Sequence, residues 1–137
     1  MANALYPTSF KQALLNAEHD LNTHVIKLTL IDSADVVGGY QATDTTYVEG
    51  ANGIEDAAKV SVATIGTPTI TTGTFDSANP TFSAVSGDVC EVLILWNDTH
   101  ATDALIAWYD TGVTGFPVTP NSGDINVTVD GAGWWSL

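Results

Sequence analysis

The sequence predicts an all-β fold: a jelly-roll-like β-sandwich with a short N-terminal α-helix. After residue 20, short apolar or alternating runs are separated by Gly, Pro, Asn and Asp. Turn signals recur at intervals of about eight to twelve residues, as in sandwiches and jelly rolls. Threonine and valine, which suit a pleated surface, are abundant. A chain of 137 residues can bury its own core without metals, and its one cysteine excludes an internal disulfide.

The first twenty residues predict the one helix of the single domain, 1–137. Residues 1–7 are expected to form an N-terminal arm, and residues 8–19 carry apolar side chains at helical spacing. Thr8 or Ser9 is suited to cap the start of this helix. The β-sandwich is expected to occupy residues 24–137.

The strand predictions follow from runs with period two or with no polar residue. Residues 89–96 form the most apolar run of the chain and show no alternation, which predicts a central strand buried on both faces. Residues 105–109 are close enough to form a hairpin with them. The Gly-, Asp- and Thr-rich segment 32–56 is expected to be a long loop or weak edge structure that offers mobile contact surface. The other strand candidates are residues 24–31, 60–65, 69–72, a short piece from Phe75, 80–85 and 124–130.

The charge balance excludes several classes of partner. Sixteen acidic residues face three lysines and no arginine, giving a net charge of −13. Phosphate backbones are bound through Lys and Arg, so nucleic acid is not an expected partner. Anionic membranes are disfavoured for the same reason. The chain opens without a basic and apolar leader and has no apolar run of about 20 residues, which predicts synthesis in a cytoplasm and no membrane partner.

Signatures of catalysis and of cofactor or metal binding are missing from the sequence, which predicts a protein that is not an enzyme and binds no cofactor or metal. It has no nucleophile elbow, no phosphate-binding loop and no H-E-x-x-H motif. His19 and His24 can approach each other, but their spacing matches no zinc pattern. Cys90 is expected to be a buried, unreactive thiol. Oxygen ligands for Ca²⁺ could come from Asn97, Asp98 and Asp103, but the order of ligands in an EF-hand loop is absent.

Apolar side chains near both chain ends are the interface candidates. Chain ends normally fray, and exposed apolar groups are costly unless a neighbour covers them. We therefore expect these side chains to contact another copy or a partner, and their removal to weaken attachment more than it lowers the melting temperature. Two alternatives remain open: the indole rings form a carbohydrate platform, or both fold over the open end of the sandwich. The five candidates are Leu5, Tyr6, Trp134, Trp135 and Leu137.

Motifs distributed over nearly the whole chain occur in a distinctive order. They include MANALY at residues 1–6, TGTFD at 72–76, TFSAVSGD at 81–88, VLILWNDT at 92–99 and FPVTPN at 116–121. This order resembles small structural proteins of tailed bacteriophages, some of which are capsid decoration (cement) proteins with a jelly-roll-like β fold.

The resemblance implies a virion protein without catalytic residues, made in the host cytoplasm and located on the capsid surface. Its implied partners are the major capsid protein and further copies of itself, as a homodimer or homotrimer. A head-fibre or tail component is the first alternative. A carbohydrate-binding β-sandwich module that uses Trp134, Trp135 or Tyr109 is the second. A hydrolase with an acidic pair is the third.

Overall fold

The computed structural model describes residues 3–137 and confirms the all-β prediction. Strands account for 31% of the chain and helices for 11%. The largest sheet has five antiparallel strands in the order β1-β8-β7-β2-β3. Its members are β1 (Ala4–Leu5), β2 (Ile26–Ile31), β3 (Lys59–Thr64), β7 (Val92–Asn97) and β8 (Ala104–Tyr109).

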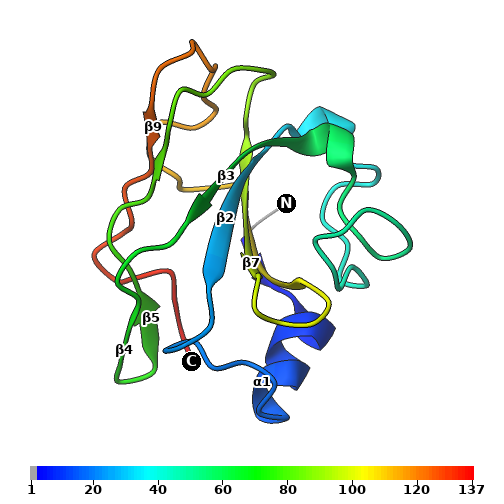
Figure 1. Ribbon diagram of the computed structural model, residues 1–137, viewed down its shortest axis with the longest axis vertical. Helices are drawn as coiled ribbons and strands as arrows, with labels where there is room; N and C mark the ends of the chain where they lie inside the picture. Colours follow the sequence, from blue (N-terminus) through cyan, green and yellow to red (C-terminus); the bar gives the residue numbers. More distant parts are fainter. Residues whose placement is uncertain (1–2) are drawn as a thin grey trace.

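Two smaller antiparallel sheets lie on one side of the five-stranded sheet (Figure 1). Strands β10, β5 and β4 form the first, and β6 and β9 form the second. The helix and the 32–56 segment lie on the other side of the large sheet (Figure 1). The bounds of these strands are β4 (Thr69–Thr71), β5 (Thr74–Asp76), β6 (Thr81–Phe82), β9 (Ile125–Asn126) and β10 (Trp135–Ser136).

Strand β7 is the centre of the large sheet, as its uniformly apolar sequence predicts. It pairs with β2 on one side and with β8 on the other, and all six of its residues are buried. The predicted hairpin of β7 with β8 is confirmed. Leu93, Ile94 and Leu95 are each 0% exposed. Full burial of one such side chain contributes roughly 1.5–3 kcal/mol, so this strand is a main source of stability.

The N-terminal helix is shorter than predicted. It begins with a π-helical turn, η1 (Pro7–Gln12), and ends with α1 (Ala13–Leu15), whereas the sequence predicted residues 8–19. Ser9 does not cap it, because its hydroxyl donates to the Leu105 carbonyl oxygen at 2.7 Å, and no side chain caps this end. Ala17 has a φ of 61°, a left-handed conformation that ends a helix.

The 32–56 segment is a long loop, as predicted, and it packs on the large sheet through a few buried side chains. Ile54 is 0% exposed and Val36 is 6% exposed. The Tyr47 ring stacks on the Trp96 ring with centroids 4.0 Å apart. Short helical turns flank the segment at η2 (Ser33–Asp35) and η3 (Asp56–Ala58). It therefore covers the outer face of the sheet, which explains why β7 and β8 are buried on both faces.

Candidate interface between the chain ends

The start of the described chain is fixed to the large sheet. Strand β1 pairs with β8, and the Tyr6 N–H continues the pairing by donating to the Ile106 carbonyl oxygen at 3.0 Å. The Asn3 side chain accepts from the backbone N–H groups of Asp110 and Thr111 at 2.9 and 3.0 Å. The predicted arm, of which residues 1–2 lie outside the described part, is thus an edge strand from Ala4 onward.

The end of the chain is fixed to a different sheet. Strand β10 pairs with β5, with Trp135 opposite Phe75. The Trp135 ring stacks on the Phe75 ring with centroids 4.4 Å apart and meets the Phe10 ring edge-on at 5.2 Å. The Leu137 N–H donates to the Gly73 carbonyl oxygen at 3.0 Å. Both ends are therefore ordered by pairing within this chain.

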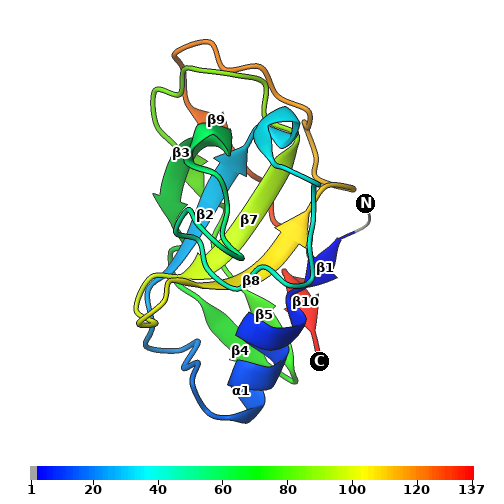
Figure 2. The same ribbon diagram turned by 90° about the vertical axis from the view of Figure 1, so that its right-hand side faces the viewer.

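A groove of about 220 Å³ lies between the two chain ends. The two strands that flank it, β1 and β10, are edge strands of different sheets and lie close together in Figure 2. Three of the five interface candidates predicted from sequence share this groove, so the fold brings residues about 130 positions apart to one place. The residues that line it are Asn3, Ala4, Leu5, Tyr109, Trp134 and Trp135.

The prediction of Tyr6 as an interface residue is wrong. Its side chain is 0% exposed, because the ring packs into the core beside Tyr40 with centroids 5.1 Å apart. Burial raises the pKa of the Tyr6 phenol, with the carboxylate of Asp44 acting in the same direction. Leu137, by contrast, is 73% exposed at the end of β10. Tyr6 thus belongs to the core, whereas Leu137 is available to a partner.

A polar cluster at the end of the helix joins distant parts of the chain through Asn97. Its Oδ1 accepts from the backbone N–H groups of Thr99 and His100 at 3.0 and 3.1 Å. Its Nδ2 therefore donates to the Nδ1 atoms of His19 at 2.9 Å and His24 at 2.8 Å. In this arrangement each imidazole accepts at Nδ1, so that ring nitrogen carries no hydrogen. Asn97 is 0% exposed, and all its hydrogen-bonding capacity is directed inward.

Acidification is expected to weaken this cluster through His19. Burial lowers the pKa of His19, and the nearby imidazoles of His100 and His24 act in the same direction, against the Ser9 carbonyl and Glu18. Above about pH 6.5 the imidazole is neutral in both states, so the contribution of His19 to stability is complete. As the pH falls below that value, His19 binds a proton in the unfolded chain before it does so in the folded protein. The contribution of His19 to the free energy of unfolding is then lost.

The measurement is the unfolding free energy of the native protein and of His19→Gln at pH values from about 7.5 to about 5. The difference between the two proteins cancels the titration of other groups. The native protein should lose stability relative to the variant across this range. A constant difference would show that His19 does not titrate as its surroundings require.

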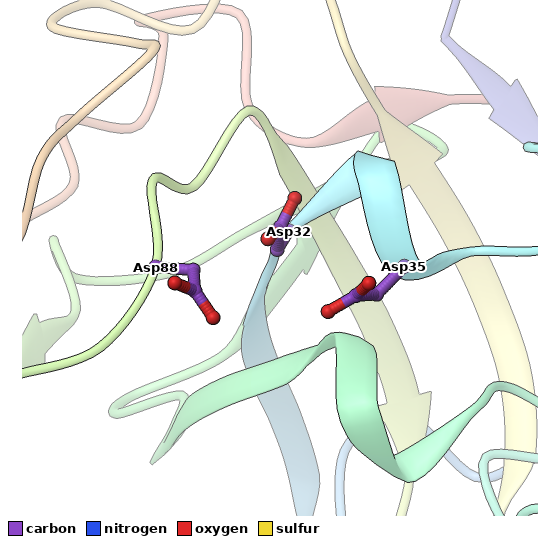
Figure 3. Close-up of side chains that lie close together, drawn as sticks. All are labelled: Asp32, Asp35 and Asp88. Atoms are coloured by element: carbon purple, nitrogen blue, oxygen red, sulfur yellow. The ribbon is translucent and has the colours of Figure 1, made fainter.

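Three carboxylates converge at one end of the large sheet (Figure 3). Asp32 follows β2, Asp35 lies on η2, and Asp88 precedes β7; one oxygen of each lies within 4.8 Å of the others. Oxygen ligands of this kind suit hard cations such as Ca²⁺. Asp35 and Asp88 are exposed, and Asp32 already accepts from the Ala34 N–H at 2.8 Å. The absence of tightly bound metal stays a prediction, which elemental analysis of washed protein checks.

Cys90 is a buried thiol, as its apolar surroundings in the sequence predict. It is 0% exposed, and burial raises its pKa to about 11, with the carboxylates of Glu91, Asp32 and Asp88 acting in the same direction. A nucleophilic cysteine requires a thiolate, which positive neighbours favour. Cys90 therefore remains protonated near neutral pH and is not suited to covalent chemistry.

Comparison with protein-family models, curated proteins and solved structures finds no match to this chain. None of the helices in residues 3–137 is long and apolar enough to cross a membrane. Three groove residues, Asn3, Ala4 and Tyr109, were not predicted as interface candidates from the sequence. Tyr109 was considered only as a carbohydrate contact, and Asn3 and Ala4 gave no signal.

Proposed function

We propose that this protein is a structural virion protein that binds and stabilises an assembled phage capsid, as a decoration (cement) protein does. The observation that carries the proposal is the groove between β1 and β10, together with the exposed Leu137 directly after β10. The order of sequence motifs described above supports the same role. The partners are the major capsid protein and copies of this chain, which form a homodimer or homotrimer at symmetric sites.

The chemistry of the groove fits the addition of an extended partner segment. Strands β1 and β10 each have a neighbour on only one side. An unpaired strand edge offers backbone donors and acceptors to a further strand. Leu5 and Trp135 supply apolar surface beside these edges. A capsid segment bound here gains backbone hydrogen bonds and covers apolar surface that one copy leaves open.

We infer a jelly-roll-like sandwich as the finer description of the fold. The large sheet faces two smaller antiparallel sheets, and their side chains form one continuous core. Such sandwiches pair antiparallel strands that are distant in sequence, as β1 with β8 and β2 with β7 do here. The strong net negative charge suits a capsid-surface protein that must not bind packaged nucleic acid.

Co-sedimentation with assembled phage capsids tests the proposal. The native protein is expected to sediment with assembled shells, to saturate at a fixed ratio, and to bind unassembled capsid protein much more weakly. A cement protein recognises the lattice, and binding of the assembled state alone is what stabilises that state. Equal binding to free subunits, or attachment to tails instead of shells, would overturn the capsid assignment.

The surface at the end of β10 is tested separately with a matched pair of surface variants. Leu137 and Val37 are similarly exposed, at 73% and 71%, but Val37 lies on the 32–56 segment. Leu137→Gln is expected to weaken attachment to shells, whereas Val37→Gln should leave attachment unchanged. Surface substitutions of this kind change stability by no more than about 0.5 kcal/mol, so both variants should fold normally. Equal attachment of both variants would place the contact surface elsewhere.

A further inference from the structure

A second depression lies beside the groove, between the loop after β8 and the loop after β9. Its volume is about 340 Å³, which is within the usual range for small-molecule sites. It shares Asn3, Tyr109 and Trp134 with the groove but extends to residues that the groove does not include. The side chains on which the argument depends are Tyr109, Thr114, Thr128, Asp130 and Trp134.

The two aromatic side chains of the depression are held in fixed positions. The Tyr109 hydroxyl donates to the Trp134 carbonyl oxygen at 2.7 Å, and the Trp134 indole N–H donates to the Ser77 hydroxyl at 2.8 Å. Their ring centroids lie 5.6 Å apart. Because the polar atoms of both side chains are already used, the rings offer a ligand mainly carbon surface. This is preorganised surface, which reduces the entropy cost of binding.

Polar side chains also line the depression. Asp130 uses one carboxylate oxygen to accept from the Ala132 N–H at 2.8 Å. Its other oxygen, and the hydroxyls of Thr114 and Thr128, take part in no hydrogen bond among residues 3–137. All three side chains are exposed. They can therefore accept from, or donate to, the hydroxyl groups of a ligand without breaking an existing bond.

The charges of the depression select against anions. No lysine lines it, and the chain has no arginine. Two of the three lysines have acidic partners elsewhere, as Lys27 pairs with Asp98 and Lys59 with Asp56. Phosphate and carboxylate ligands would meet the Asp130 charge without a cation to offset it. A neutral ligand with many hydroxyls and one apolar face matches the combination of aromatic and polar side chains that line the depression.

We propose that this depression binds a neutral saccharide. The apolar C–H face of a pyranose ring lies against Tyr109 and Trp134, and its hydroxyls donate to the Asp130 carboxylate and exchange hydrogen bonds with Thr128 and Thr114. This activity goes beyond the proposed attachment to capsids and does not depend on it. It would let a particle that carries the protein adhere to surface glycans.

Nuclear magnetic resonance titration of the ¹⁵N-labelled full chain tests the proposal. The probes are methyl β-glucoside, methyl β-galactoside and methyl N-acetyl-β-glucosaminide. A ligand of this size is expected to bind with a Kd on the order of 1 mM, so titration to about 50 mM should saturate the site. The amide signals of residues 111–114 and 127–131 should shift with at least one probe. No shift with any probe, or shifts confined to other residues, would overturn the proposal.

A double variant separates this site from the groove. Thr128→Val with Asp130→Asn removes one hydroxyl and the charge, while the asparagine can still accept from the Ala132 N–H. Saccharide binding should weaken about tenfold or more, since buried hydroxyls of the sugar lose their acceptors. Thr71→Val with Asp88→Asn, exposed and outside the depression, is the matched control and should bind as the native protein does. Unchanged binding in the first variant, or equal loss in both, rejects the site irrespective of capsid attachment.

Discussion

Replacement of Asn97 by leucine is expected to lower the free energy of unfolding by about 3–5 kcal/mol, because it leaves several buried or part-buried polar groups without partners. The backbone N–H groups of Thr99 and His100 lose their shared acceptor. The Nδ1 atoms of His19 and His24 lose their donor. Each unsatisfied buried group costs about 1–3 kcal/mol, and partial access to water reduces the total.

Asn22→Leu is the matched control for this variant. Asn22 is exposed, and its side chain makes no hydrogen bond among the described residues. Chemical denaturation of both variants measures the effect, and the control should lie within about 0.5 kcal/mol of the native protein. If the two variants are equally stable, the Asn97 cluster does not hold the helix end to the sheet.

The second large effect is expected from Trp135→Ala, which should lower the free energy of unfolding by about 3 kcal/mol. The variant removes the ring that packs on Phe75 and Phe10. Strand β10 therefore loses its aromatic contacts with β5 and with the N-terminal helix. This outcome differs from the sequence-based expectation that alanine here weakens attachment more than stability. Thermal unfolding provides the measurement, with Leu137→Ala as the exposed control on the same strand end. A melting temperature as high as that of the control would show that Trp135 is dispensable to the core.

The central strands were predictable because their signal is local. Residues 92–96 and 104–108 carry only apolar or aromatic side chains, and such a run is stable only where both faces of a strand are covered. The pairing of the two followed from the short polar segment between them. The local run of apolar residues was therefore sufficient to predict the middle of the large sheet. The stability of these strands depends on the burial of their side chains more than on any particular contact.

The helix end and the polar cluster were not predictable, because their determinants are far apart in the chain. Ser9 was expected to cap the helix, but its hydroxyl bonds to a carbonyl 96 residues away. His19 and Asn97 are 78 residues apart, and only the fold makes them partners. Asn97 was instead considered as a calcium ligand. A local polar pattern does not reveal which distant group satisfies it.

The candidate interface was predictable in part. The apolar composition of both ends indicated a functional surface, and the fold places Leu5, Trp134 and Trp135 around one groove. The apolar composition of the chain ends did not distinguish Tyr6 from Leu5, although the two residues are adjacent in an extended stretch of backbone and point in different directions. Alternation directs Tyr6 into the core, where it is 0% exposed, whereas Leu5 remains beside the groove.

The thermal stability of assembled capsids tests the central claim most directly. A protein that binds only the assembled shell stabilises each occupied site by about 2.7 kcal/mol at a free concentration of 100 Kd. Capsids saturated with this protein should therefore dissociate at a higher temperature than bare capsids, and Leu137→Gln at equal concentration should give a smaller increase. A dissociation temperature that is unchanged while the protein is bound at saturation would contradict a cement function.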